Sequence, residues 1–278
     1  MTKAEFQYEG LLVFTPVSIK SKVDLSSSSS SGIGEHLPEF LQGNPDNPSE
    51  GFEEHDLHNY LKNDRFQPDS LRSLVSEITY IEYKSESYSE EEAYVDGRYK
   101  DVHIRQLETA DIFILKPDLA LLRGKRATVE KAISAIQRIR KADVLIEPII
   151  FSPDFLHNLY YRSEQLFTNS KIKPREITEM RFEGPDSIST LKTHSEHINS
   201  DLQDIYQSSN EGQIEFLTRR YSVFGLNTVV QIQKDRLHVK TSKSELSGLG
   251  ELETMLHSIY LCKEITEIAA ELLDKNFI

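Results

Sequence analysis

Two pairs of histidines are the residues in this chain whose spacing most directly suggests chemistry. His55 and His58 stand three positions apart, as do His194 and His197. On a helix that spacing places two imidazoles on one face, where they can share a metal ion. Neither pair has metalloprotease spacing, and the single Cys262 offers no cysteine pair to complete a zinc site. A metal-dependent hydrolase built on these histidines is the least favoured of three hypotheses.

Sequence motifs for nucleotide binding and nucleophilic catalysis are also absent. The chain has no Walker-type loop, no Gly-x-Gly-x-x-Gly and no Gly-x-Ser-x-Gly. Carboxylates are too numerous for a catalytic pair to be recognised from sequence. The turn from Arg123 to Arg126 precedes a predicted helix, whose N-terminus can hold a phosphate, although most such turns are only turns. We therefore expect a non-enzymatic protein without a cofactor.

Bulk composition narrows the class of protein further. The 278 residues carry a net charge of −13, which argues against a generally basic nucleic-acid coat but leaves room for a local basic patch. One cysteine excludes an intramolecular disulfide and is compatible with a reducing compartment. No stretch approaches the roughly 18 apolar residues of a membrane span, and the N-terminus lacks a signal-like apolar core. We expect a soluble, intracellular protein of the cytoplasm or nucleus, without a membrane partner.

A strand–turn–strand–helix unit occurs twice and organises the predicted fold. Between Asp111 and Ile136 the pattern predicts a strand, a turn at Pro117, a second strand, Gly124 and an amphipathic helix. Thr228–Thr241 predicts a second hairpin that leads into another helix. The apolar stripe of that last helix contains Leu252, Met255, Leu256, Ile259 and Cys262.

The rest of the chain divides into short elements. Predicted strands lie around Thr15-Pro16 (two strands within 6–23), at 76–84, at 102–107, at 144–151 and at 176–183. Predicted helices lie at 52–61, after Ser152-Pro153-Asp154, and at 188–205, where apolar residues recur at 3-4-3-4-3 spacing. Serines 26–31 predict a flexible loop, and the acidic stretch 85–97 predicts an exposed loop.

Element order and scattered identities indicate an internal duplication. A shift of 99 positions pairs Phe52 with Phe151, and likewise His58 with His157. Each half reads strand, helix, strand, insertion, hairpin, helix, which favours two repeats. We predict an α+β fold in which the two repeats share one curved antiparallel sheet, covered by helices, about a pseudo-two-fold axis. The first repeat spans 1–142 with a Ser-rich insertion at about 24–50, and the second spans 143–278 with an inserted helix at about 186–210.

These segments resemble the TATA-box-binding protein and its relatives. Arg65-Phe-Gln-Pro-Asp69 resembles the family's Tyr-Asn-Pro-Glu segment, and 228–245 resembles its final hairpin. Residues 119–136, with Gly124, resemble the same segment of the other repeat. The resemblance implies a saddle whose concave sheet binds the DNA minor groove and kinks it with apolar wedges, reading shape and deformability.

The resemblance also implies binding residues. Leu115 and Ile232 match the family's wedge at the hairpin tip, and Arg123 and Lys240 stand where the family has base-contacting threonines. The family's paired asparagines have no counterpart in the predicted first strands, so we expect little TATA specificity. Cations expected to neutralise phosphates are Lys116, Arg123, Lys125, Arg126, Arg181, Lys234, Lys240 and Lys243.

The leading hypothesis is a divergent saddle protein that binds duplex DNA within transcription, with a transcription-factor-like protein partner on its helices. The second hypothesis is a protein-interaction module that kept the saddle and lost DNA binding. It draws on the charge of −13, the missing asparagines and the predicted helix at 188–205. The sign of the charge on the concave sheet separates the two.

Overall fold

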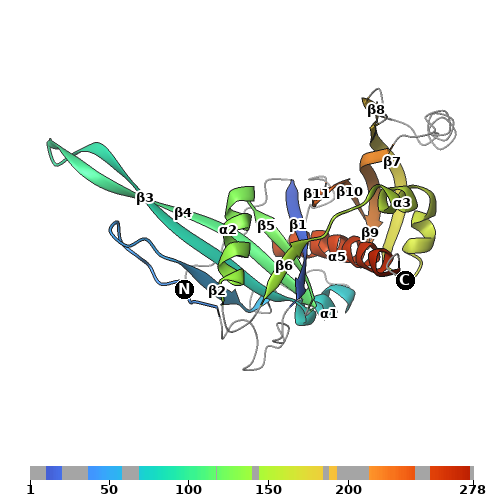
Figure 1. Ribbon diagram of the computed structural model, residues 1–278, viewed down its shortest axis with the longest axis horizontal. Helices are drawn as coiled ribbons and strands as arrows, with labels where there is room; N and C mark the ends of the chain where they lie inside the picture. Colours follow the sequence, from blue (N-terminus) through green and yellow to red (C-terminus); the bar gives the residue numbers. More distant parts are fainter. Residues whose placement is uncertain are drawn as a thin grey trace. The chain divides into compact units, whose positions relative to one another are not determined.

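The computed structural model describes residues 11–20, 37–57, 69–116, 118–139, 144–183, 188–192, 213–241 and 251–275. Within these ranges the chain is α+β, with antiparallel sheet and four helices (Figure 1). The described residues form two compact units. Unit 1 takes residues up to Pro16, residues 69–75 and everything from Pro148 onward, and unit 2 takes 17–57 and 76–147. None of the described helices is both long and apolar enough to cross a membrane.

Unit 2 is a sheet with a helix on one face. Its strands lie in the order β2 (Glu50–His55), β3 (Thr79–Val95), β4 (Arg98–Lys116), β5 (Leu119–Gly124) and the second half of β1 (Leu12–Lys20). The strand β6 (Leu145–Pro148) pairs with β1, and α2 (Arg126–Gln137) follows β5. The register of β3 on β4 is unbroken from Thr79 opposite Ile114 to Val95 opposite Arg98.

The core of unit 2 forms between α2 and one face of its sheet. Apolar side chains of α2 pack on those of the strands because the helix stripe and the alternate strand positions face each other. The helix contributes Val129, Ala132, Ala135 and Ile136, and the strands contribute Val17, Ile19, Ile81, Tyr83, Ile112, Ile114, Ala120 and Leu122. The alternate residues Tyr80, Phe113 and Leu121 are buried as well. Strands buried on both faces read as the continuous apolar runs seen at 112–115 and 119–122.

Gly124 ends β5 in a conformation that requires glycine. Its φ is 152°, and a Cβ at this position would lie 3.2 Å from both Ala110 Cβ and Thr109 O. Side chains rarely adopt such a backbone conformation. The glycine therefore lets β5 stop beside β4 and lets α2 begin two residues later.

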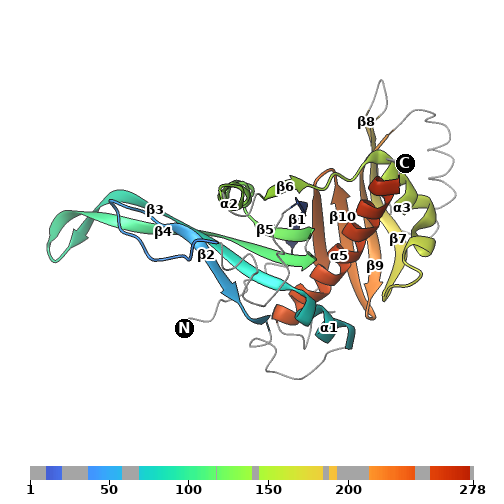
Figure 2. The same ribbon diagram turned by 60° about the horizontal axis from the view of Figure 1, so that its bottom comes forward.

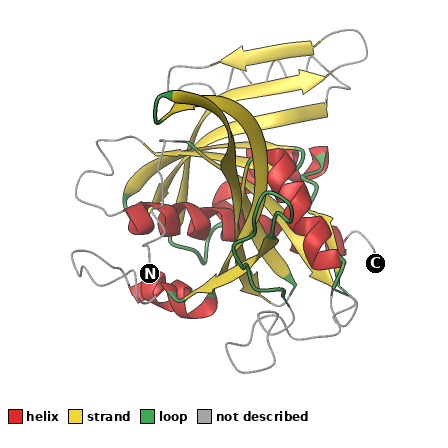
Figure 3. Ribbon diagram, turned by 90° about the vertical axis from the view of Figure 1, so that its left-hand side faces the viewer, coloured by secondary structure: helices red, strands yellow, loops and turns green. Residues whose placement is uncertain are grey.

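Beyond β2, the strands β3 and β4 continue outward as a two-stranded ribbon that curves along its length (Figures 1 and 3). A two-residue turn closes it at Asp96 and Gly97, whose φ values of 54° and 78° are both positive. Positive φ at both central residues is the signature of the tight hairpin turn whose twist matches that of strands.

Unit 1 combines a second antiparallel sheet with helices. Its strands lie in the order β1 (first half), β11 (Arg236–Thr241), β10 (Leu226–Gln233), β9 (Gln213–Val223), β7 (Ile172–Glu183) and β8 (Ile188–Lys192). Its helices are α1 (Asp69–Glu77), α3 (Pro153–Leu166) and α5 (Glu251–Lys275). Figure 2 shows α5 crossing β9 and β10. Ser152 caps α3 by accepting a hydrogen bond from the Phe155 amide at 3.1 Å, with Pro153 in the first turn, as the sequence predicted.

Three secondary-structure predictions are wrong. Residues 85–97 form strand and hairpin turn, because backbone pairing with β4 sustains a polar strand. Residues 52–55, predicted to be helical, belong to β2, which adds to the edge of β3. Residues 188–192 form β8, because pairing with β7 overrides a short helical periodicity. The remainder of that predicted helix and the serine run 26–31 lie outside the described residues.

One further prediction, on the first strands, differs from the structure. One strand, β1, passes through Thr15 and Pro16 where two strands were expected. Its buried positions shift phase there, from Leu12 and Phe14 to Val17 and Ile19. The compact units interleave along the chain, and the two repeats at 1–142 and 143–278 stay a prediction.

Candidate nucleic-acid interface

The sheet of unit 1 has one face that packs on helices. A guanidinium nitrogen of Arg219 donates to the Leu159 carbonyl of α3 at 2.8 Å, and the Tyr221 ring contacts Phe167 at 5.6 Å between centroids. Because side chains alternate along a strand, the neighbouring residues of β9, such as Arg220, point to the opposite face. We call that opposite surface the open face.

Cross-strand register defines which residues share the open face. Three rows cross it: Val13, His238, Gln231 and Thr218; then Lys240, Val229 and Arg220; then Arg236 and Gln233. Directly opposed residues on adjacent strands share a face, so each row is a line of neighbouring side chains. Lys240 is exposed, and Gln231, Gln233 and Arg236 are partly exposed. Thr218 and the Nε2 atom of His238 are buried, so the rows present mainly amide and cationic groups to solvent.

The open face carries Arg220, Arg236 and Lys240 in a chain whose net charge is −13. Glu176 and Glu179 of β7 lie beside them, next to Arg220 and opposite Thr218 respectively. Arg220 is paired with Glu176 at 2.5 Å. Lys240 and Arg236 have no carboxylate partner within the part of the chain that the structure describes. Burial and then the nearby Arg236 lower the pKa of His238, and its Nε2 is buried without a hydrogen-bond partner in the described structure.

Of the predicted phosphate contacts, three described residues lie in unit 1. Lys240 is on the open face, and Lys234 is in the turn between β10 and β11, where both side chains are exposed. Arg181, in β7, forms an ion pair with Glu215 at 2.7 Å. Lys243 lies outside the described residues. The hairpin of β10 and β11 thus carries Lys240 in a strand and Lys234 in its turn.

The two predicted apolar wedges need correction. Ile232 has no exposed surface and faces the helices, on the side of the sheet opposite to Lys240. Leu115, in unit 2, is only 3% exposed. A wedge must reach between base pairs from the surface, and neither side chain is presented for that.

The predicted cations of unit 2 are largely engaged with their own chain. Arg123 contacts the Asp111 carboxylate at 2.5 Å, and the Tyr80 hydroxyl donates to the same carboxylate at 2.9 Å. Burial and then Asp111 raise the pKa of Tyr80 far above its ordinary value, so the phenol stays protonated. Arg126 contacts Glu130 at 2.8 Å, whereas Lys125 is exposed at the start of α2. The placement of the Lys116 side chain is outside what the structure describes.

His55 belongs to a polar cluster that joins β2 to β3. Its Nε2 lies 3.2 Å from Glu82 Oε2, and Glu53 completes a group whose ligand atoms lie within 4.8 Å of one another. The Lys84 ammonium contacts both carboxylates, Glu53 at 2.5 Å and Glu82 at 3.2 Å. It thereby neutralises two acids that face each other across the strands. The other histidines of the hydrolase hypothesis, at 58, 194 and 197, lie outside the described residues.

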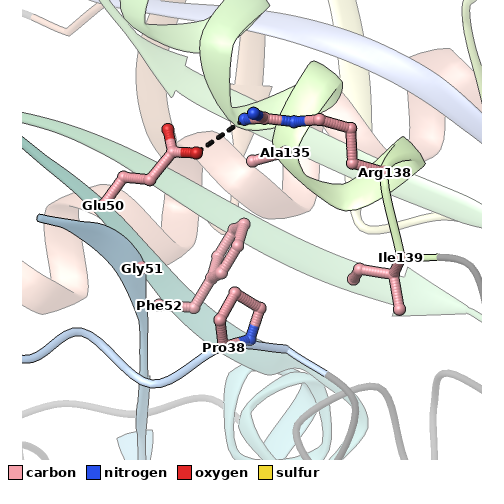
Figure 4. Close-up of a pocket in the computed structure, with 7 residues that line it drawn as sticks. All are labelled: Pro38, Glu50, Gly51, Phe52, Ala135, Arg138 and Ile139. Carbon is pink, nitrogen blue, oxygen red and sulfur yellow. Dashed lines mark hydrogen bonds and ion pairs between the residues drawn. The ribbon is translucent and has the colours of Figure 1, made fainter.

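A cavity of about 350 Å³ opens beside the C-terminal end of α2 (Figure 4). Glu50 and Arg138 form an ion pair at 2.7 Å, and the Tyr83 hydroxyl donates to Glu50 at 2.9 Å. Burial and then Glu50 raise the pKa of Tyr83 to about 12. The lining residues are Pro38, Glu50, Gly51, Phe52, Ala135, Arg138 and Ile139. This cavity is mostly apolar, and its one carboxylate is already paired.

The sequence prediction missed most residues of the open face, including Arg236, Gln231, Gln233 and His238. The signal was present in the hairpin 228–241. Apart from Val229, the residues of β10 and β11 alternate between apolar or threonine side chains and polar ones, and period-two alternation separates the two faces of a strand. The cations were predicted one by one, without regard to the face of the strand on which each lies.

A comparison with known protein families gives no match, and no curated protein has a significantly similar sequence.

Proposed function

We propose that this protein binds nucleic acid through the open face of unit 1. The observation that carries the proposal is the set of cations Lys240, Arg236 and Arg220 around Gln231 on one face of the sheet, within an acidic chain. Local positive charge attracts the phosphate backbone even when the whole protein is anionic.

Different side-chain types on the open face make different contacts with the nucleic acid. Lys240 and Arg236 contact phosphates, which gives affinity without sequence information. Gln231 and Gln233 carry amides that donate and accept hydrogen bonds, and their side chains already bond to each other at 3.2 Å. Val13 and Val229 supply apolar contacts to the bases or sugars. The resemblance to the TATA-box-binding protein family supports duplex DNA and its minor groove as the first target.

The test is fluorescence anisotropy with a labelled DNA duplex, and with a single strand of the same sequence. We expect affinity to fall steeply between about 50 and 200 mM salt, with a slope of about −0.9 per phosphate neutralised on duplex DNA. The variant Arg236→Gln/Lys240→Gln is expected to reduce the magnitude of that slope by about 2.

The matched control is Lys131→Gln, which removes a cation from α2 in the other unit. It is expected to leave the slope and the affinity unchanged. Failure of the wild-type protein to bind either probe at low salt would overturn the proposal. Equal affinities for the wild type and the Arg236/Lys240 variant would overturn the assignment to the open face.

A further inference from the structure

The outer part of the β3–β4 ribbon pairs only with itself among the described strands. The strand β2 accompanies β3 no further than Ser85, opposite Glu50, and residues 86–95 of β3 then pair with residues 98–107 of β4. An isolated two-stranded hairpin is marginally stable in water. A ribbon of this length is therefore expected to gain stability by packing against another surface.

The base of the ribbon is fixed by Glu86. Its carboxylate accepts hydrogen bonds from the amides of Gly43 and Ser49, at 2.8 and 3.2 Å, and contacts Arg105 at 2.5 Å. Desolvation opposes ionisation, but these hydrogen bonds and the guanidinium lower the pKa of Glu86 below its usual value. The contacts of Glu86 therefore hold the base of the ribbon in place.

Charge is distributed unequally between the two faces of the ribbon. One face carries Glu90, Glu92 and Tyr94 on β3 and their cross-strand neighbours His103, Asp101 and Tyr99 on β4. We call this the acidic face. From His103 outward it contains no Lys or Arg, because Arg98 and Lys100 alternate to the other side.

Two tyrosines end the acidic face and are among the most exposed large side chains in the described structure. Tyr94 is 68% and Tyr99 is 70% exposed, and their rings meet edge to face at 5.2 Å. Such rings bury apolar area and offer an electron-rich face to cations. Tyrosine is also enriched at protein interfaces.

We propose that the acidic face docks an arginine- and lysine-rich segment of a partner protein. Guanidinium groups pair with the carboxylates of Glu90, Glu92 and Asp101 and stack on Tyr94 and Tyr99. Same-face positions on a strand repeat every about 6.6 to 6.8 Å, so an extended segment with a cation at every second residue matches the spacing. This surface repels nucleic acid, and its role is independent of the open face.

The probe is a fluorescein-labelled peptide of alternating arginine and valine, titrated with the full chain at low salt. The variant Glu90→Gln/Glu92→Gln/Asp101→Asn is expected to weaken binding more than about tenfold. Tyr94→Ser/Tyr99→Ser, which preserves net charge, is expected to weaken it about threefold or more.

The matched control is Glu54→Gln/Glu91→Gln/Glu271→Gln, which removes three exposed carboxylates outside the acidic face. It is expected to change affinity less than about twofold, the range of an exposed charge at a distance. DNA affinity is expected to be unaffected by the acidic-face variants. The proposal falls if the peptide does not bind, if both triple variants weaken binding equally, or if the tyrosine variant binds like the wild type.

Discussion

His257 should make unit 1 sensitive to acid. The imidazole lies in α5 with 4% of its surface exposed, and neither ring nitrogen has a hydrogen-bond partner in the described structure. The Phe224 ring meets it edge to face at 5.3 Å. Desolvation lowers the pKa of His257 to about 4. The perturbation is His257→Leu, which keeps the volume apolar and removes the titrating group.

The magnitude follows from proton linkage. The unfolded chain binds a proton at its ordinary pKa of about 6.5, whereas folded His257 binds it only near pH 4. As pH falls from 6.5 to 4, the unfolded state is therefore stabilised first, and the free energy of unfolding decreases. A shift of about 2.5 pKa units at 1.36 kcal/mol each gives a loss of about 3 kcal/mol at pH 4 and almost none above pH 7.

The assay is urea unfolding of the wild type and of His257→Leu at intervals between pH 4 and 7.5. Other titrating groups are common to both proteins, so the difference between the two unfolding free energies isolates His257. The difference should change by about 3 kcal/mol across this range, in favour of the variant at low pH. Parallel pH profiles would refute the reasoning, because they would mean that the folded and unfolded imidazoles titrate alike.

Two further substitutions test unit 2. Asp111→Asn removes the carboxylate that holds Arg123 and Tyr80, and leaving a half-buried guanidinium unpaired should cost about 2 to 4 kcal/mol in urea unfolding; a change below about 0.5 kcal/mol would contradict this. Gly51→Ala would place a Cβ 2.6 Å from the backbone of Phe40, so the segment beside β2 must move. In the wild type the Phe40 amide donates a hydrogen bond to the Phe52 carbonyl at 3.0 Å. We expect faster hydrogen exchange at this amide in the variant.

The elements that depend on local signals could be predicted from the sequence. The hairpin 228–241 and the helices α2 and α5 were predicted because apolar periodicity, turn residues and glycine agree within each short stretch. All five residues of the predicted stripe, from Leu252 to Cys262, are buried. These segments could be predicted because their local preference agrees with their tertiary packing.

The ribbon could not be recognised from hydrophobic pattern, because its outer strands are polar. Glu90, Glu91 and Glu92 read as a solvated loop, although Asp96-Gly97 is a strong hairpin signal. Backbone hydrogen bonds to a partner strand do not register in side-chain periodicity. The prediction of a loop at 85–97 therefore followed the polar composition and disregarded the turn signal at Asp96-Gly97.

The residues of the open face were predicted only in part, for a related reason. Lys240 lies on the open face, but Arg123 was chosen from the equivalent place in the other hairpin, where Asp111 neutralises it across the strands. Ile232 was chosen as a hairpin tip, although alternation turns it toward the helices. Which face a residue occupies depends on what packs there, and that is a tertiary property.

The strand β1 has a consequence for the order of folding. Its second half places Val17 and Ile19 in the core of unit 2, and its first half pairs Leu12 with Val239 of β11, far later in the chain. Unit 2 can assemble largely from neighbouring segments, whereas the sheet of unit 1 must wait for a long loop to close. Because one strand serves both units, melting it removes an element from each.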